Sequence, residues 1–148
     1  MKLKFGQMRD ELTLFLTQWP FEWFATFSFK TPVEQEIGRM RLIEWTRALC
    51  VKEGVQVAYV AVFNKVNRSH LHVLMLARNK TGKTLSNISV STWSRHWGHN
   101  AKIDPIYNLY GVGAYLSRKN FSFEDTDKWD VFSYNKNLLE KAKIGSLL

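Results

Sequence analysis

Residues 55–77 read V-Q-V-A-Y-V-A-V-F-N-K-V-N-R-S-H-L-H-V-L-M-L-A, and this stretch decides the fold. The run from Val55 to Phe63 is rich in β-branched and aromatic residues, which favours a buried strand. The run from His70 to Ala77 is mostly apolar and predicts the next strand. Because the polar, basic segment 64–69 is short enough for a turn, the two strands are expected to form a β-hairpin.

The segment before this hairpin predicts a strand and then a helix. Residues 24–29 alternate between two faces as a strand does. Thr31 is suited to cap the following helix, with Pro32 at the first helical position and Glu34 completing a capping box. Gly54 is placed to end this helix, because glycine readily adopts the left-handed conformation of a helix C-terminus.

The segment after the hairpin predicts a helix, a short strand and a second helix. The second helix spans about residues 108–119, and the strand about 101–106. The first of these helices ends at Gly98 and carries four apolar residues: Leu85, Ile88, Trp93 and Trp97. Another helix is expected over about residues 6–18, and the segment from Phe121 onward is acidic and then helical.

The predicted order is therefore helix, then β-α-β-β-α-β, then helix. The middle six elements have the split-βαβ pattern, which predicts an α+β, ferredoxin-like fold: an antiparallel sheet with helices packed on it, plus N- and C-terminal helices. No stretch resembles a linker, so residues 1–148 are expected to form a single domain.

Composition narrows the class of protein. A formal net charge of +8 and a pI near 9.7 favour a polyanionic partner, and 45% hydrophobic residues argue against a disordered chain. No apolar run approaches the roughly 20 residues of a membrane span, so a membrane protein is not expected. The single cysteine, Cys50, fits a reducing compartment, and we expect the protein to be cytoplasmic.

His70 and His72 are the first candidate site residues. Alternate side chains of a strand share a face, so both imidazoles are expected to point the same way. A buried imidazole needs a hydrogen-bond partner or a metal. Two nitrogen ligands with open positions suit Mn²⁺ or Mg²⁺ in phosphate chemistry, or Zn²⁺.

Tyr115 is the second candidate, on the predicted helix that ends near Lys119. Arg118 and Lys119 follow it at spacings of three and four residues, which puts all three side chains on one helix face. Gly111 and Gly113 would let this helix approach the sheet closely. The two basic residues would then hold a phosphate and stabilise its developing charge.

These motifs resemble those of a known family. Residues 24–29, then His70-Leu71-His72, then the segment from Tyr115 to Lys119 are similar to the three ordered motifs of the HUH endonucleases, closest to the single-tyrosine rolling-circle replication initiators (Rep proteins) of plasmids and small viruses. The resemblance implies a nuclease domain that nicks single-stranded DNA at an origin or hairpin. It implies that His70 and His72 bind Mn²⁺ or Mg²⁺, and that Tyr115 forms a 5′-phosphotyrosine link.

The sequence departs from the family pattern at two positions. The family supplies a third, acidic ligand from the preceding strand, but that strand contains no acid, and Asn64, Gln56 or a water molecule are the available substitutes. The family also places Lys at the third position after tyrosine, where this chain has Arg118. Tyr110 is a rival nucleophile, and Tyr107 a weaker one.

The sequence thus predicts a metal-dependent endonuclease and strand transferase acting on single-stranded DNA, with basic loops 65–68 and 78–83 positioning the DNA backbone. A host helicase would supply unwinding. Two alternatives stay open: a single-tyrosine HUH transposase acting as a homodimer, and a non-catalytic nucleic-acid-binding module on the same fold.

Two further motifs carry less weight. Gly82-Lys83-Thr84 lacks the first glycine of a P-loop, because position 77 is alanine. His96 and His99 have no cysteine pair beside them and are expected to be surface residues near a helix C-terminus.

Overall fold

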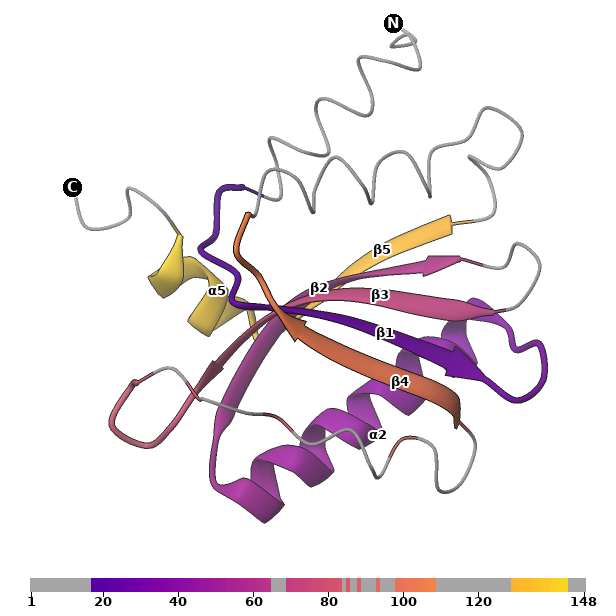
Figure 1. Cartoon of the computed structure of the whole chain (residues 1–148), viewed down its shortest axis with the longest axis horizontal. Coiled ribbons are helices and arrows are strands. Elements are labelled where there is room, and N and C mark those ends of the chain that lie inside the picture. Colours follow the sequence, from indigo (N-terminus) through magenta and orange to yellow (C-terminus); the bar gives the residue numbers. More distant parts are fainter. Residues whose placement is uncertain are drawn as a thin grey trace, which may run out of the picture.

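The computed structural model describes residues 17–64, 69–83, 85, 88, 93, 98–108 and 129–143. These residues form an α+β structure in which strands and helices are layered (Figure 1). In chain order the elements are β1 (Trp23–Phe29), α2 (Gln35–Glu53), β2 (Gln56–Asn64), β3 (His70–Arg78), β4 (Gly98–Pro105), β5 (Trp129–Tyr134) and α5 (Lys136–Ala142).

The five strands form one sheet in the order β4-β1-β3-β2-β5, and every neighbouring pair is antiparallel (Figure 1). The first four strands have the ferredoxin-like order, with β1 and β3 at the centre. The predicted fold class is therefore confirmed. β5 adds a strand next to β2 that the sequence pattern did not reveal.

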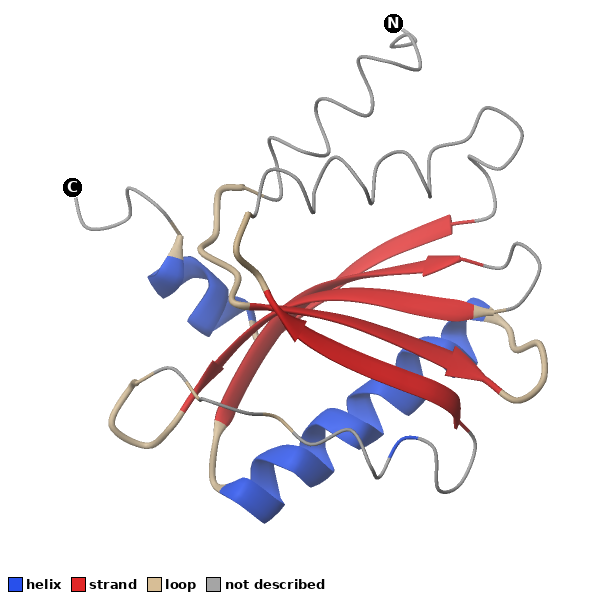
Figure 2. Ribbon diagram, viewed as in Figure 1, coloured by secondary structure: helices blue, strands red, loops and turns tan. Residues whose placement is uncertain are grey.

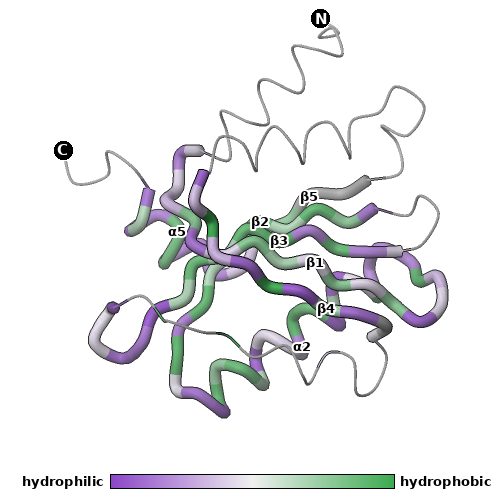
Figure 3. The backbone as a smooth tube through the Cα atoms, viewed as in Figure 1, coloured by the Kyte–Doolittle hydropathy of each residue, from purple (hydrophilic) through white to green (hydrophobic). Residues whose placement is uncertain are grey.

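The predicted hairpin is also confirmed, with β2 pairing β3 from Gln56 opposite Arg78 to Asn64 opposite His70. Side chains of these two strands are buried from Val57 to Asn64 and from Leu71 to Ala77. Both faces of the hairpin must therefore be covered, which explains why its sequence is almost continuously apolar. Figure 3 shows this hydrophobic centre in green, with hydrophilic residues in the loop at the end of β3 and along parts of β1 and β4.

The two described helices lie on opposite faces of the sheet (Figure 2). We call the face packed against α2 the inner face; its core includes Phe27, Trp45 and Tyr59. We call the opposite face the outer face; there Leu139 of α5 packs with Val60, and Trp19 and Phe21 belong to the same cluster. Neither helix combines the length and apolar character that crossing a bilayer requires.

Helix α2 begins later than the sequence predicted. The capping position is Glu34 rather than Thr31, and its side chain makes no capping hydrogen bond. Ser69 accounts for the delay, because its Oγ accepts from the backbone N of Val33 at 3.0 Å and donates to the carbonyl oxygen of Val33 at 3.2 Å. These bonds hold residue 33 against the start of β3. The helix ends before Gly54, which is left-handed as predicted.

The prediction of a helix ending at Gly98 is confirmed only at Trp93, which is helical, among the described residues. Leu85 and Ile88 have no regular secondary structure, and Gly98 begins β4. Gly98 is required for packing instead, since a Cβ there would lie 2.2 Å from Cδ1 of the Trp93 ring. Trp93 is fully buried against Phe27, and its Nε1 donates to the carbonyl oxygen of Ser28 at 2.9 Å.

The C-terminal segment was predicted as acidic and then helical, and the strand β5 within it was missed. The helical part is confirmed as α5, which Asn135 caps by accepting a hydrogen bond from the backbone N of Leu138 at 3.2 Å. The predicted helices over 6–18 and 108–119 lie almost entirely outside the described residues.

Candidate functional site

The two histidines at the start of β3 share the outer face, as their spacing predicted. Their ring centroids are 4.8 Å apart and their planes meet at 82°. His72 is 7% exposed, whereas His70 is half-buried at the strand end. The sheet thus holds two imidazoles side by side, one enclosed and one open to solvent.

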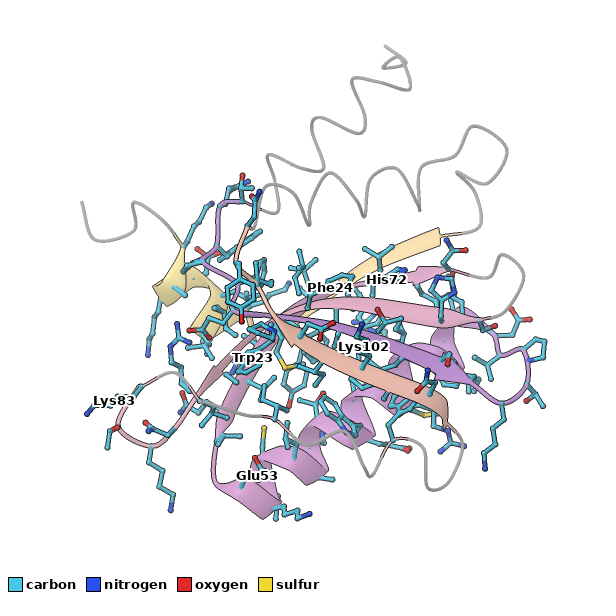
Figure 4. The ribbon with its side chains drawn as sticks, viewed as in Figure 1. Trp23, Phe24, Glu53, His72, Lys83 and Lys102 are labelled. Atoms are coloured by element: carbon cyan, nitrogen blue, oxygen red, sulfur yellow. The ribbon has the colours of Figure 1, made fainter. Side chains whose placement is uncertain are left out.

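Strand β1 fixes the orientation of His72 through two side chains. Thr26 lies directly opposite His72 in the β1–β3 register, and its Oγ1 is 3.3 Å from His72 Nδ1. Phe24 stacks on the imidazole with a centroid distance of 5.6 Å and an interplanar angle of 11°. Figure 4 shows Phe24 and His72 together on the side of the sheet away from α2. When Nδ1 donates its hydrogen bond to Thr26 Oγ1, Nε2 is the imidazole nitrogen that would bind a metal.

The separation of the two rings fits a shared divalent ion. A ligating nitrogen lies about 2.1 Å from its metal, so two imidazoles on one ion at angles of about 90–110° have centroids roughly 4.5–5.2 Å apart. The observed 4.8 Å falls within this range. The centroid distance is therefore compatible with both imidazoles binding one ion, and Thr26 provides the kind of outer hydrogen bond that orients a ligating histidine.

The described residues offer no acidic side chain as a third metal ligand beside the two histidines. Among the residues that the structure describes, no group of three His, Cys, Asp or Glu side chains could hold a metal. Asn64 lies directly opposite His70 on β2 and is 5% exposed. Gln56 is paired with Arg78 at the other end of the same strand, about 27 Å away at 3.4 Å per residue, so it cannot join the histidines.

Lys102 on β4 belongs to the same surface, although no sequence motif selects it. Thr26 is opposite Lys102 on one side and opposite His72 on the other. Directly opposed residues of an antiparallel sheet present their side chains on one face, so Lys102 shares the outer face with the histidines. Its side chain is 74% exposed, with Nζ 3.5 Å from Asp104 Oδ2. Only the pairing register of β4 against β1 could have identified it.

The basic loop 78–83 was predicted to position DNA at the site, but it lies at the far end of β3 (Figure 1). Eight residues separate His70 from Arg78, or about 27 Å along the strand. Arg78 forms an ion pair with Glu22, so its charge is already compensated. Asn79 closes the loop, since its Oδ1 accepts from the backbone N of Thr81 and of Lys83 at 2.9 Å.

Tyr107 is not placed to act at the histidines. It is 93% exposed and follows Pro105, which is opposite Trp23, three residues along β1 from the level of Thr26. His99 lies within β4 rather than at a helix end. The other predicted site residues lie outside the described part of the chain: Tyr115, Arg118, Lys119, Tyr110, His96 and the loop 65–68.

Comparisons of the chain with models of protein families, with curated proteins and with solved structures gave no match.

Proposed function

We propose that the protein is a metal-dependent endonuclease that nicks and rejoins single-stranded DNA through a tyrosine, and that it initiates rolling-circle replication inside its host cell. The observation that carries this proposal is the histidine pair of β3, held 4.8 Å apart on the outer face of the sheet. The resemblance of the ordered motifs to the HUH endonucleases supports the same function.

His70 and His72 would hold Mn²⁺ or Mg²⁺, which supplies polarisation of a phosphate oxygen when bound. The chain's own residues prepare this position. Thr26 and Phe24 fix the ring of His72 from β1, and antiparallel pairing with β1 and β2 fixes the backbone of β3. Rigid placement on a central strand favours reproducible geometry at the phosphate.

In the proposed reaction the phenol oxygen of Tyr115 attacks the scissile phosphorus. A P–O bond to tyrosine forms, the P–O3′ bond breaks, and the departing 3′ oxygen takes up a proton while the phenol loses one. Arg118 and Lys119 would stabilise the charge that develops on the phosphate. The 5′-phosphotyrosine bond retains the energy of the original diester, so rejoining by a 3′-OH needs no ATP.

A binding module without catalysis is the second candidate function, favoured by one observation. No carboxylate joins the two histidines within the described residues, so the site would carry no negative charge of its own to hold a cation. Such a module would bind single-stranded nucleic acid on the same surface and leave it intact.

The decisive experiment is to incubate the protein with a long single-stranded DNA of random sequence and Mn²⁺, and to search for a covalent adduct by denaturing gel electrophoresis. We expect an adduct that is lost in Tyr115→Phe and in the double variant His70→Ala/His72→Ala. An adduct that survives Tyr115→Phe but not Tyr110→Phe would move the nucleophile. Binding without any adduct would favour the non-catalytic module.

A further inference from the structure

The outer face of the sheet is divided into an apolar half and a polar half. On the β2 side of the histidines, Val60 and Val62 are 3% and 1% exposed, and α5 packs beyond them. On the β4 side, Thr26 and Ser28 are half-exposed, and Asn100 and Lys102 are exposed. Within the part of the chain that the structure describes, the polar, accessible surface next to the histidine pair therefore lies on the β4 side.

Lys102 stands at the centre of this polar half. Two strand spacings of about 4.8 Å separate its backbone from that of His72, or roughly 10 Å in total. A lysine side chain spans roughly 6 Å on its flexible four-carbon stem, so the ammonium can reach over β1 toward the histidines. A phosphate next to one held by the histidines would lie within its reach.

The charges around Lys102 permit this contact. Lys102 forms an ion pair with Asp104, and the two side chains are 74% and 51% exposed, so this 3.5 Å pair is a weak solvent-screened one that a phosphate can replace. Asn100 lies opposite Ser28, whose hydroxyl donates to the Asn100 carbonyl oxygen at 3.3 Å, which steadies the strand beside Lys102.

We propose that Lys102 holds a phosphate of the DNA strand adjacent to the histidine pair, so that the strand crosses β1 and runs out over β4. The contact orients the backbone and carries no sequence information, because an ammonium recognises the phosphate as a point charge. The inference rests on the proposed function in that the bound strand is single-stranded DNA. It adds the path of the DNA across the sheet and the residue that anchors the DNA there.

The experiment measures binding of a fluorescent 20-nucleotide single strand of mixed sequence in EDTA, over a range of salt concentrations. One lost phosphate contact lowers the slope of log affinity against log salt by about 0.7 for single strands. We expect this loss in Lys102→Gln, and recovery in Lys102→Arg. Lys52→Gln is the matched control, because Lys52 is an exposed lysine in the last turn of α2, behind the sheet.

Equal slopes for wild type and Lys102→Gln would overturn the proposal. An equal decrease of the slope in Lys52→Gln would also overturn it, because it would show that binding depends only on the net charge of the protein. A polyglutamate peptide that binds as tightly as the oligonucleotide, with the same dependence on Lys102, would also overturn it. No cleavage is needed for this readout, so its failure is distinct from the absence of a covalent adduct. Unchanged thermal unfolding of Lys102→Gln verifies that the variant is folded.

Discussion

The Oγ1 atom of Thr26 lies 3.3 Å from Nδ1 of His72, and this contact joins the two central strands of the sheet at the candidate site. It sets which imidazole nitrogen points outward, since the ring cannot rotate freely while Phe24 stacks on it. A hydroxyl on β1 is thus placed to orient the proposed ligand on β3.

Replacing Thr26 with valine should weaken Mn²⁺ binding about 10-fold, because loss of an outer hydrogen bond to a ligating histidine costs roughly 10–100-fold in affinity. Isothermal titration calorimetry or the electron paramagnetic resonance signal of free Mn²⁺ measures the change. Thr81→Val serves as the control, since its hydroxyl bonds to Asn79 Oδ1 in the loop at the far end of β3, away from the histidines. Equal affinities for wild type and Thr26→Val would show that Thr26 has no such role.

Asn64→Asp should tighten Mn²⁺ binding by at least 10-fold. The side chain is opposite His70 and 5% exposed, so a carboxylate there would place a negative charge beside the two imidazoles, and hard cations prefer such oxygens. Gln56→Asp places the same charge at the far end of the same strand and should leave affinity unchanged. If both variants bind Mn²⁺ equally, Asn64 does not face the ion.

The structure predicts a loss of stability in alkali that depends on Tyr59. Burial raises the pKa of this phenol well above its ordinary value of 10.0, even though its hydroxyl lies 3.3 Å from Thr46 Oγ1. Below pH 10 both states keep the proton; above it the unfolded chain loses the proton first, so the free energy of unfolding falls as pH rises, by up to about 1.4 kcal/mol per pH unit. Urea titrations between pH 9 and 11.5 should show a shallower decline in Tyr59→Phe. Identical pH profiles would contradict the burial of the phenol.

Gly38→Ala should destabilise the protein by about 1–2 kcal/mol, although alanine favours helices by roughly 1 kcal/mol over glycine. A Cβ at this position of α2 would lie 2.7 Å from Cε2 of Phe63 on β2, and overpacking of this kind costs roughly 1–3 kcal/mol. Val51→Ala, at a helix position that is 85% exposed, should change stability little. Thermal or urea unfolding compares the two, and a stabilised Gly38→Ala protein would contradict the packing of α2 against β2.

The sheet could be predicted because β1, β2 and β3 obey local rules. The alternation in β1 and the apolar runs of β2 and β3 match the burial of these strands, so each strand can be recognised from its own residues. The shared face of His70 and His72 follows from strand geometry alone. The bounds found for β2 and β3 differ from the predicted ones by a single residue at the ends.

The parts that could not be predicted depend on contacts distant in sequence. Ser69 delays the start of α2 across a separation of 36 residues, and Gly98 is set by the ring of Trp93 rather than by a helix end. Lys102 joins the site only through the register of β4 against β1, and Gln56 leaves it for the same kind of reason. Sequence spacing predicts the β2–β3 hairpin, but it does not give the register between strands that are distant in the chain.

The central claim is that a tyrosine attacks a phosphate held at the histidine pair, and mass spectrometry of the protein after reaction with single-stranded DNA and Mn²⁺ tests it most directly. We expect, after protease and nuclease digestion, one peptide that carries a 5′-phosphonucleotide on Tyr115, and none from the His70→Ala/His72→Ala protein. Modification of Tyr110 would move the nucleophile, whereas a modified residue that is not a tyrosine, or equal modification without the two histidines, would contradict the claim.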